Sequence, residues 1–181
     1  MTFVELEGLW KAIMGSNPSY FKGDSRPVEQ VSWNDCQAFI KKLNRATGKN
    51  FRLPTEAEWE FAARGGNNSK YYQYSGSNNL TAVTWCSVNS GDTTHDVATK
   101  QANELGLYDM SGNVWEWCSD WWGSYGCSAQ TNPTGAASEY FHVFRGGSWD
   151  FVAGYCRTSC RSCSDPDIHF CNLGLRLALS E

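Results

Sequence analysis

Thiols are the groups in this 181-residue chain that could most readily do chemistry. The eight cysteines are Cys36, Cys86, Cys118, Cys127, Cys156, Cys160, Cys163 and Cys171. Cys160 and Cys163 form a Cys-x-x-Cys pair, a spacing that can bind a soft metal or act as a redox couple. A metal centre would need a second pair or histidines at fixed spacing, and the sequence has neither, so we expect unpaired thiols. Disulfides stay open as a second interpretation, although four cysteines crowd into the last 26 residues instead of tying distant segments together.

The other ionisable residues argue against an acid–base triad and against nucleic acid. His95, His142 and His169 are scattered, and none stands at the spacing of a triad or of a His-x-x-x-His pair. The net charge is −4 and no run of lysine or arginine occurs, so the chain offers nothing for phosphate backbones or anionic lipid. Nucleic acid is therefore excluded as a ligand.

Three helices are expected in the first third of the chain. An apolar stripe at i, i+3, i+4 and i+7 predicts the first over residues 5–14. Ser32 and Thr55 each precede an acidic residue three positions later, which predicts N-caps for the second and third. Gly48 and Gly65 stand where these two helices should end.

The rest of the chain predicts loops and short strands. Residues 66–140 are rich in Asn, Ser, Gly, Thr and Asp and show no sustained helical period. Two strands are predicted, over 142–145 and over 174–179. Helices first and sparse strands later predict an α+β fold, and no linker or repeat divides the chain, so residues 1–181 are expected to form a single domain.

Six motifs, taken together in this order, are specific to one family. They are Asn-Pro-Ser-Tyr-Phe (17–21), Pro-Val-Glu-Gln-Val-Ser-Trp (27–33), Arg-Leu-Pro-Thr-Glu-Ala-Glu-Trp-Glu (52–60), Gly-Leu-Tyr-Asp-Met-Ser-Gly-Asn-Val-Trp-Glu-Trp (106–117), Arg-Gly-Gly-Ser-Trp (145–149) and Gly-Leu-Arg (174–176). From about residue 9 to 179 the chain resembles the formylglycine-generating enzyme and sulfatase-modifying factor family. The resemblance implies a C-type lectin fold of the formylglycine-generating-enzyme subclass, loop-rich, with few short strands and two or three helices.

The resemblance also raises the question of an enzyme. Enzymes of the family use two cysteines five residues apart, shortly after Gly-Gly-Ser-aromatic, to bind copper as thiolates. Here the second falls on Cys156 and the first on Phe151, which can neither ligate a metal nor react as a nucleophile. We therefore predict a protein that is not an enzyme, with copper-dependent oxidation of a substrate cysteine as the alternative.

A family calcium site is a separate expectation. By resemblance it would use the side chains of Asp109 and Glu116 with the backbone carbonyls of Gly112 and Val114, an all-oxygen set that suits Ca²⁺. The alternative is that Asp109 caps a turn and Glu116 pairs with an arginine. No other cofactor is expected.

The composition of residues 150–172 indicates a variable surface. This segment contains no Lys, Glu, Gln, Met or Trp, which make up 33 of the preceding 149 residues, so chance absence is on the order of one in three hundred. These are the five types that an Asn codon ending in a pyrimidine cannot become when its two adenines are randomised.

This pattern resembles the variable proteins of diversity-generating retroelements, including those of spirochaetes. The resemblance places a variable ligand-binding segment at residues 144–172. The expected ligand-contacting positions are Phe144, Asp150, Phe151, Val152, Tyr155, Cys160, Ser162, Cys163, Ser164, Asp165, Ile168, His169, Phe170 and Cys171. The competing interpretation is an ordinary family member in which residues 150–172 are a structural loop.

Partner and location follow from the same resemblance. It implies a macromolecular ligand, in the first place a protein, and display on the cell surface by a lipoprotein. No stretch approaches the roughly 20 apolar residues of a membrane span, and residues 1–5 lack the pattern of a signal peptide. A lipid anchor would therefore lie outside this chain. A sugar-binding lectin would need a Glu-Pro-Asn or Gln-Pro-Asp signature, which is absent.

Overall fold

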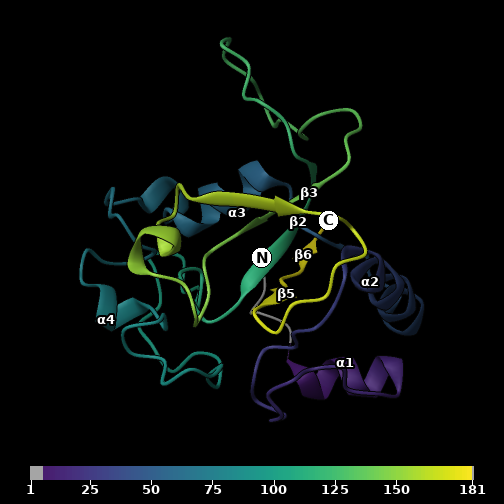
Figure 1. Ribbon diagram of the computed structural model, residues 1–181. Helices are drawn as coiled ribbons and strands as arrows, with labels where there is room; N and C mark the ends of the chain where they lie inside the picture. The colour runs from purple at the N-terminus through teal and green to yellow at the C-terminus, as the bar shows by residue number, and fades with distance from the viewer. Residues whose placement is uncertain (1–5, 181) are drawn as a thin grey trace.

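A four-stranded sheet lies at the centre of the computed structural model, which describes residues 6–180 (Figure 1). β2 (Trp115–Trp121) pairs antiparallel with β3 (His142–Arg145) and parallel with β5 (Leu173–Leu175). β4 (Arg161–Ser164) pairs antiparallel with the other side of β3, which gives the order β4-β3-β2-β5. β4 is therefore an edge strand, and it lies within the segment expected to vary.

The predicted strand over 174–179 is wrong as a single element. The structure divides it between β5 and β6 (Ala178–Leu179), and β6 pairs with β1 (Phe51–Arg52) in a separate two-stranded sheet. The division falls at Arg176, whose buried guanidinium donates two hydrogen bonds of 2.9 Å to Glu116 on β2. The chain therefore leaves the central sheet at Arg176, the residue whose hydrogen bonds to Glu116 hold it against β2.

The first three helices agree closely with the predictions from the sequence. They are α1 (Glu7–Met14), α2 (Trp33–Thr47) and α3 (Glu56–Ala63). The single turn α4 (Leu80–Val83) and the 3₁₀ turns η1 (Gly66–Asn68) and η2 (Ala153–Cys156) were not predicted. Ser32 and Thr55 form complete capping boxes, as predicted, and Gly48 takes the left-handed conformation that ends α2. The first helix begins at Glu7, and residue 5 lies outside the described residues.

Aromatic rings fill the core between the helices and the central sheet. Trp10 of α1 stacks on Phe39 of α2, with ring centroids 4.7 Å apart. Trp117 of β2 is fully buried, and its indole nitrogen donates to the carbonyl of Val31 at 3.0 Å. These rings supply apolar area that the short strands alone would lack.

Arginine–carboxylate pairs join the strands and α3. Arg176 pairs with Glu116, which was the alternative to a calcium site, and Arg52 pairs with Glu58 at 2.6 Å. Arg145 contacts both Glu56 and Glu60 of α3. The guanidinium groups of Arg145 and Arg176 are completely buried, so these pairs compensate charges that could not otherwise stay in the interior.

The segment between β2 and β3 leaves the body of the molecule as an extended arm (Figure 1). Tyr125, Tyr140 and Phe141 on this arm are exposed. No helix among residues 6–180 is long and apolar enough to cross a membrane.

Candidate ligand-binding surface

The fourteen residues expected to contact a ligand lie on one continuous path, from β3 through η2 and β4 to the loop before β5. Six are exposed: Asp150, Val152, Tyr155, Asp165, His169 and Phe170. Seven are half-buried: Phe151, Cys160, Ser162, Cys163, Ser164, Ile168 and Cys171. Thirteen of the fourteen therefore reach the surface.

Phe144 is the exception, because it is only 6% exposed. Its ring packs edge-on against Trp115 and Trp117, at centroid distances of 5.1 and 5.4 Å. It also lines a small pocket of about 170 Å³, together with Phe151, Phe170 and other residues of this face. Phe144 could therefore touch a ligand only through that pocket, and its side chain is otherwise part of the core.

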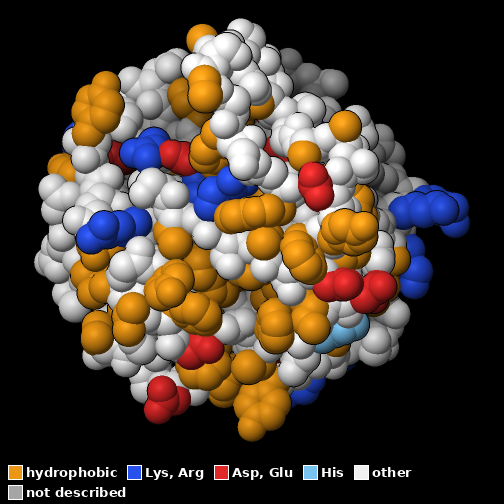
Figure 2. Space-filling model, turned by 45° about the horizontal axis from the view of Figure 1, so that its top comes forward, with side chains coloured by type: hydrophobic (Ala, Val, Ile, Leu, Met, Phe, Trp, Pro, Cys, Tyr) orange, Lys and Arg blue, Asp and Glu red, His pale blue; other side chains and the backbone are white. Residues whose placement is uncertain are grey.

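Apolar or aromatic side chains make up half of the exposed part of the path. Val152, Tyr155 and Phe170 are 59%, 46% and 42% exposed. The Phe151 ring bridges Tyr155 and the core, with centroids 5.0 Å from Tyr155 and 5.6 Å from Trp115. Figure 2 shows apolar side chains gathered across one face of the molecule, with acidic and basic side chains scattered between them and around the edge. Exposed apolar groups of this kind mark interaction surfaces.

The backbone of the path is held mainly by groups outside the fourteen. The carbonyl of Phe151 accepts from the amide of Ser87 at 3.1 Å, and that of Phe170 accepts from the amide of Gln30 at 3.0 Å. The indole nitrogen of Trp149 donates to the carbonyl of Cys171 at 3.2 Å. None of these three bonds uses a side chain of the fourteen, so they can persist when those side chains change.

Arg145 and Arg161 extend this support to β4. Arg145 of β3 donates to the carbonyls of Cys160 and Thr158. Arg161 donates to the carboxylate of Glu56, and its guanidinium stacks 4.0 Å above the ring of Trp122. Two arginines thus fix the edge strand between α3 and the sheet.

Three of the fourteen side chains make hydrogen bonds that hold the scaffold; the first, Asp165, accepts from the amide of Asp167 at 2.9 Å. Asp150 accepts hydrogen bonds from Ser148 at 2.6 Å and from the amide of Asn172 at 2.9 and 3.0 Å. His169 contacts Asp35, with 2.7 Å between Nε2 and the carboxylate oxygen. Hydrogen bonds from Ser32 and His169 lower the pKa of Asp35 despite partial burial, which raises it. The contact of His169 with Asp35 lies at the surface, where its loss costs little, whereas the Ser148 partner of Asp150 is buried.

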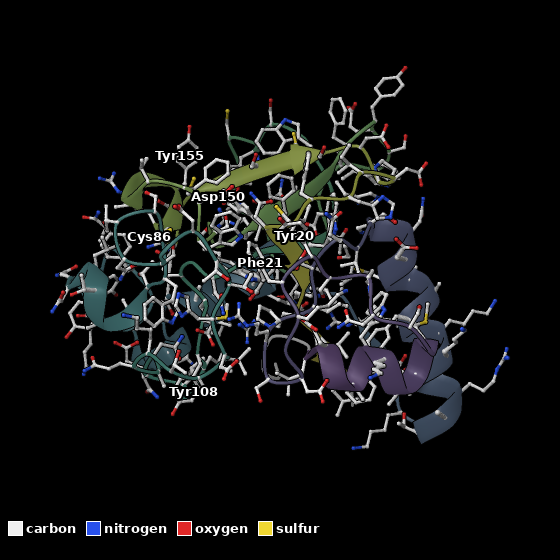
Figure 3. The ribbon with its side chains drawn as sticks, turned by 60° about the horizontal axis from the view of Figure 1, so that its bottom comes forward. Tyr20, Phe21, Cys86, Tyr108, Asp150 and Tyr155 are labelled. Atoms are coloured by element: carbon white, nitrogen blue, oxygen red, sulfur yellow. The ribbon has the colours of Figure 1, made fainter. Side chains whose placement is uncertain are left out.

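Tyr20 and Phe21 lie next to this path, and the sequence analysis did not single them out as ligand contacts. The ring of Phe21 packs edge-on against Trp149 at 5.2 Å, and Tyr20 packs on Phe21 and is 69% exposed. Figure 3 shows both residues beside Asp150. They come from a loop more than a hundred positions away in the chain, so no local signal could place them here.

The Cys-x-x-Cys pair does not form a site. Cys160 packs toward the core ahead of β4, whereas Cys163 lies on β4, and residues three apart on extended chain point to opposite faces. Burial raises the pKa of both thiols. No group of three or more His, Cys, Asp or Glu side chains that could hold a metal occurs within residues 6–180.

A different second thiol does lie beside Cys156. Cys86, which the sequence analysis did not select, hydrogen-bonds with it, and both residues are completely buried. The hydrogen bond with Cys156 lowers the pKa of Cys86 to about 6, and the same bond with burial raises the pKa of Cys156. Phe151, at the position of the family's other copper ligand, packs instead against Trp115.

The residues of the expected calcium site already have partners. Both oxygens of Glu116 accept from Arg176 at 2.9 Å, and one accepts from the indole of Trp59 at 2.7 Å. Asp109 accepts from the amide of Ala98 at 2.7 Å, and burial raises its pKa. A cation bound by these side chains with the carbonyls of Gly112 and Val114 would have to compete with Arg176, so the set fits calcium poorly. Calcium binding stays a prediction.

The fold and these motifs define a C-type lectin fold of the formylglycine-generating-enzyme type. Residues 2–181 match the sulfatase-modifying factor enzyme 1-like domain, and the chain belongs to this FGE-sulfatase family. The resemblance inferred from the six motifs is thereby confirmed.

Three relatives show what the chain is similar to. The solved structure of Treponema denticola variable protein 1 superposes with a TM-score of 0.89, at 34% identity over 95% of this chain and 80% of that chain. The formylglycine-generating enzyme of Thermomonospora curvata is 35% identical over 93% of this chain and 60% of its own length. Chaperone protein LppX of Paenibacillus barcinonensis is 35% identical over 77% of this chain and 65% of its own length. The chain thus spans less than two thirds of these two curated relatives.

Proposed function

We propose that this chain is a non-catalytic binding protein that presents a variable surface, built by thirteen residues of 150–172 and by Phe144 at the pocket, to a macromolecular ligand. The observation that carries the proposal is that different groups along this path hold the backbone and face the surface. Groups outside the fourteen hold much of its backbone, while thirteen of the fourteen residues reach the surface. A surface of this kind can change its side chains without losing its fold.

The residues between the fourteen support the same proposal. Cys156 and Thr158 are buried, and Arg161 is ion-paired to α3. The amide of Thr158 donates to the carbonyl of Gln73 at 3.1 Å, which joins the path to a distant loop. These three positions therefore have structural contacts, whereas Gly154, Arg157 and Ser159, which also lie between the fourteen, are exposed. The contacts of the three are what we expect where adenine-directed mutagenesis by a retroelement rewrites only chosen codons. The similarity to a Treponema denticola variable protein supports this origin.

A protein is the ligand class that this surface suits best. Tyr155 and Phe170 are exposed rings beside an apolar pocket, and such rings give large contact area for little loss of side-chain entropy. Display on the cell surface belongs to the same proposal, since a diversified binding surface has to meet ligands outside the cell.

The test of a variable surface is the gene itself, sequenced with its flanking DNA across isolates of the source organism. We expect differences to concentrate at the fourteen codons, with a nearby near-copy that carries adenines there and a reverse transcriptase gene. A segment as constant as Arg145 to Trp149, with no copy nearby, would reject the proposal.

A second test uses the protein alone. The six exposed members are replaced together by Asn, and we expect Tm to fall by less than about 5 °C because surface substitutions cost little. Arg145→Ala is the matched control, since it removes the donor to the carbonyls of Thr158 and Cys160, and we expect it to unfold the protein or lower Tm far more. A six-residue variant as unstable as the control would show that the segment is a structural loop.

Copper-dependent oxidation of a substrate cysteine is the second candidate, because one observation favours it. Cys86 supplies a second thiol at Cys156 although Phe151 occupies the family position. Two thiolates are ligands that copper(I) favours. Reduced protein that retains one copper(I) per chain against a competing chelator, and loses it in Cys86→Ser and Cys156→Ser, would support the oxidase; no retention would reject it.

A further inference from the structure

Two buried thiols from segments seventy positions apart meet beneath the variable path. Cys86 follows α4, and Cys156 is the last residue of η2. Both are 0% exposed and belong to one apolar cluster with Tyr74 and Val83. Their sulfur atoms are hydrogen-bonded to each other, so they are already in contact. Figure 3 shows Cys86 under the turn that carries Tyr155.

The surrounding backbone holds the two thiols in this position. The amide of Cys86 donates to the side chain of Asn89 at 2.9 Å, which turns the loop after α4 back on itself. The next amide, that of Ser87, donates to the carbonyl of Phe151 and ties this loop to the variable path. Gly147 leaves the room that Cys156 needs, because a Cβ at Gly147 would lie 2.7 Å from the Cys156 sulfur.

The position of the pair suits a disulfide. Both thiols are fully buried in one cluster, and their side chains are hydrogen-bonded to each other. The part of the chain that the structure describes brings no third metal-ligating side chain to these two. Two sulfurs held in contact away from solvent are placed to join to each other.

We propose that Cys86 and Cys156 form a disulfide that fastens the first part of the variable path to the scaffold. The oxidant is a small disulfide such as oxidised glutathione. The Cys86 thiolate attacks one sulfur of the donor, so the donor bond breaks and one donor thiolate leaves. Cys156 then gives up its proton and attacks the Cys86 sulfur, which forms the new bond and releases the second donor thiolate. Two electrons pass to the donor, which leaves as two thiols.

Because both thiols are buried in the folded protein, the exchange occurs before folding is complete. Neither sulfur is reachable in the folded protein, so the exchange takes place while the loop after α4 is still open during folding. Once formed, the bond links Cys86 to the turn that presents Val152 and Tyr155, whatever residues occupy those positions. The disulfide itself does not depend on the proposed binding function.

The experiment is oxidative refolding of the full chain in a glutathione buffer, followed by blocking of free thiols in denaturant, digestion and peptide mass spectrometry. We expect the peptides of Cys86 and Cys156 to be linked, six thiols to stay free, and Tm to rise by about 5–15 °C over the reduced protein. Eight free thiols, or a linkage that uses other cysteines, would overturn the proposal.

Three variants separate this bond from a general effect of thiol loss. Cys86→Ser and Cys156→Ala should each abolish the linkage and the difference in Tm between oxidised and reduced protein. Cys163→Ser is the matched control, because Cys163 lies on β4 and is only half-buried. This variant should keep both the linkage and the difference in Tm. If a variant fails to fold, the difference in Tm between oxidised and reduced wild-type protein still tests the proposal. The absence of that difference would refute the disulfide.

Discussion

Arg161 donates from its Nε and Nη2 atoms to the two carboxylate oxygens of Glu56, at 2.7 and 2.6 Å. This contact joins β4, the edge strand of the proposed ligand-binding path, to the first turn of α3, 105 positions away. The guanidinium also donates to the carbonyl of Gly123 at 2.9 Å. Arg161, which is not one of the fourteen proposed contact residues, therefore positions the strand that carries Ser162, Cys163 and Ser164.

Replacement of Arg161 should loosen that strand. Arg161→Ala leaves the buried Glu56 carboxylate with the hydroxyl of Tyr125 at 3.0 Å and the longer contact to Arg145 at 3.5 Å, so we expect the free energy of unfolding to fall by about 3 kcal/mol. Urea unfolding followed by tryptophan fluorescence measures the change. Arg52→Ala is the control, since its pair with Glu58 is about 40% exposed and should cost less than about 1 kcal/mol. Equal losses in the two variants would contradict a special role for Arg161.

Phe144 should behave unlike the other thirteen positions. Its side chain is buried against Trp115 and Trp117, so Phe144→Ala would leave a cavity in the core. We expect a loss of about 3–5 kcal/mol in the free energy of unfolding. The comparison is Phe170→Ala, because Phe170 lines the same pocket but is 42% exposed and should lose much less. If both variants unfold at the same denaturant concentration, the assignment of Phe144 to the core is wrong.

Local signals in the sequence were sufficient to predict the helices α1, α2 and α3. Ser32 and Thr55 with their acidic partners fixed where α2 and α3 begin, because a capping box is a contact within four residues. The strand over 142–145 was also predicted correctly. These elements depend on neighbours along the chain, and the sequence contains those neighbours directly.

β2 could not be recognised in the same way. It is buried along most of its length, including Glu116 and Asp120, so the alternation that marks a half-buried strand is missing. Those carboxylates are acceptable there only because distant groups such as Arg176 and the amide of Glu56 bond to them. The contact of Cys86 with Cys156 could not be predicted either, because it depends on the path of a loop and not on the spacing of the two residues in the sequence.

Calcium should leave the stability of this protein unchanged. Glu116 already has the positive charge of Arg176 as its partner, so a Ca²⁺ ion would gain little from that carboxylate. We expect Tm to be the same in 1 mM CaCl₂ and in excess chelator. A rise of several degrees with calcium that Asp109→Ala removes would instead establish the family site at Asp109, Gly112, Val114 and Glu116.

Glu29 should make the protein less stable as the solution becomes neutral. Burial raises its pKa from 4.5 to about 7, while hydrogen bonds from the amides of Phe21 and Tyr20 offset part of the shift. The folded protein thus holds this proton more tightly than the unfolded chain. The contribution of Glu29 to stability is complete below pH 4.5 and is lost as pH rises to about 7, a change of about 3 kcal/mol.

Glu29→Gln isolates this contribution, because the amide oxygen can still accept from Phe21 but cannot ionise. The free energy of unfolding of the wild type, measured in urea between pH 4.5 and 8, should fall more steeply than that of the variant. Other titrating groups are the same in both proteins, so they cancel in the difference. Parallel curves would mean that Glu29 titrates normally and that its burial is relieved by contacts other than those described.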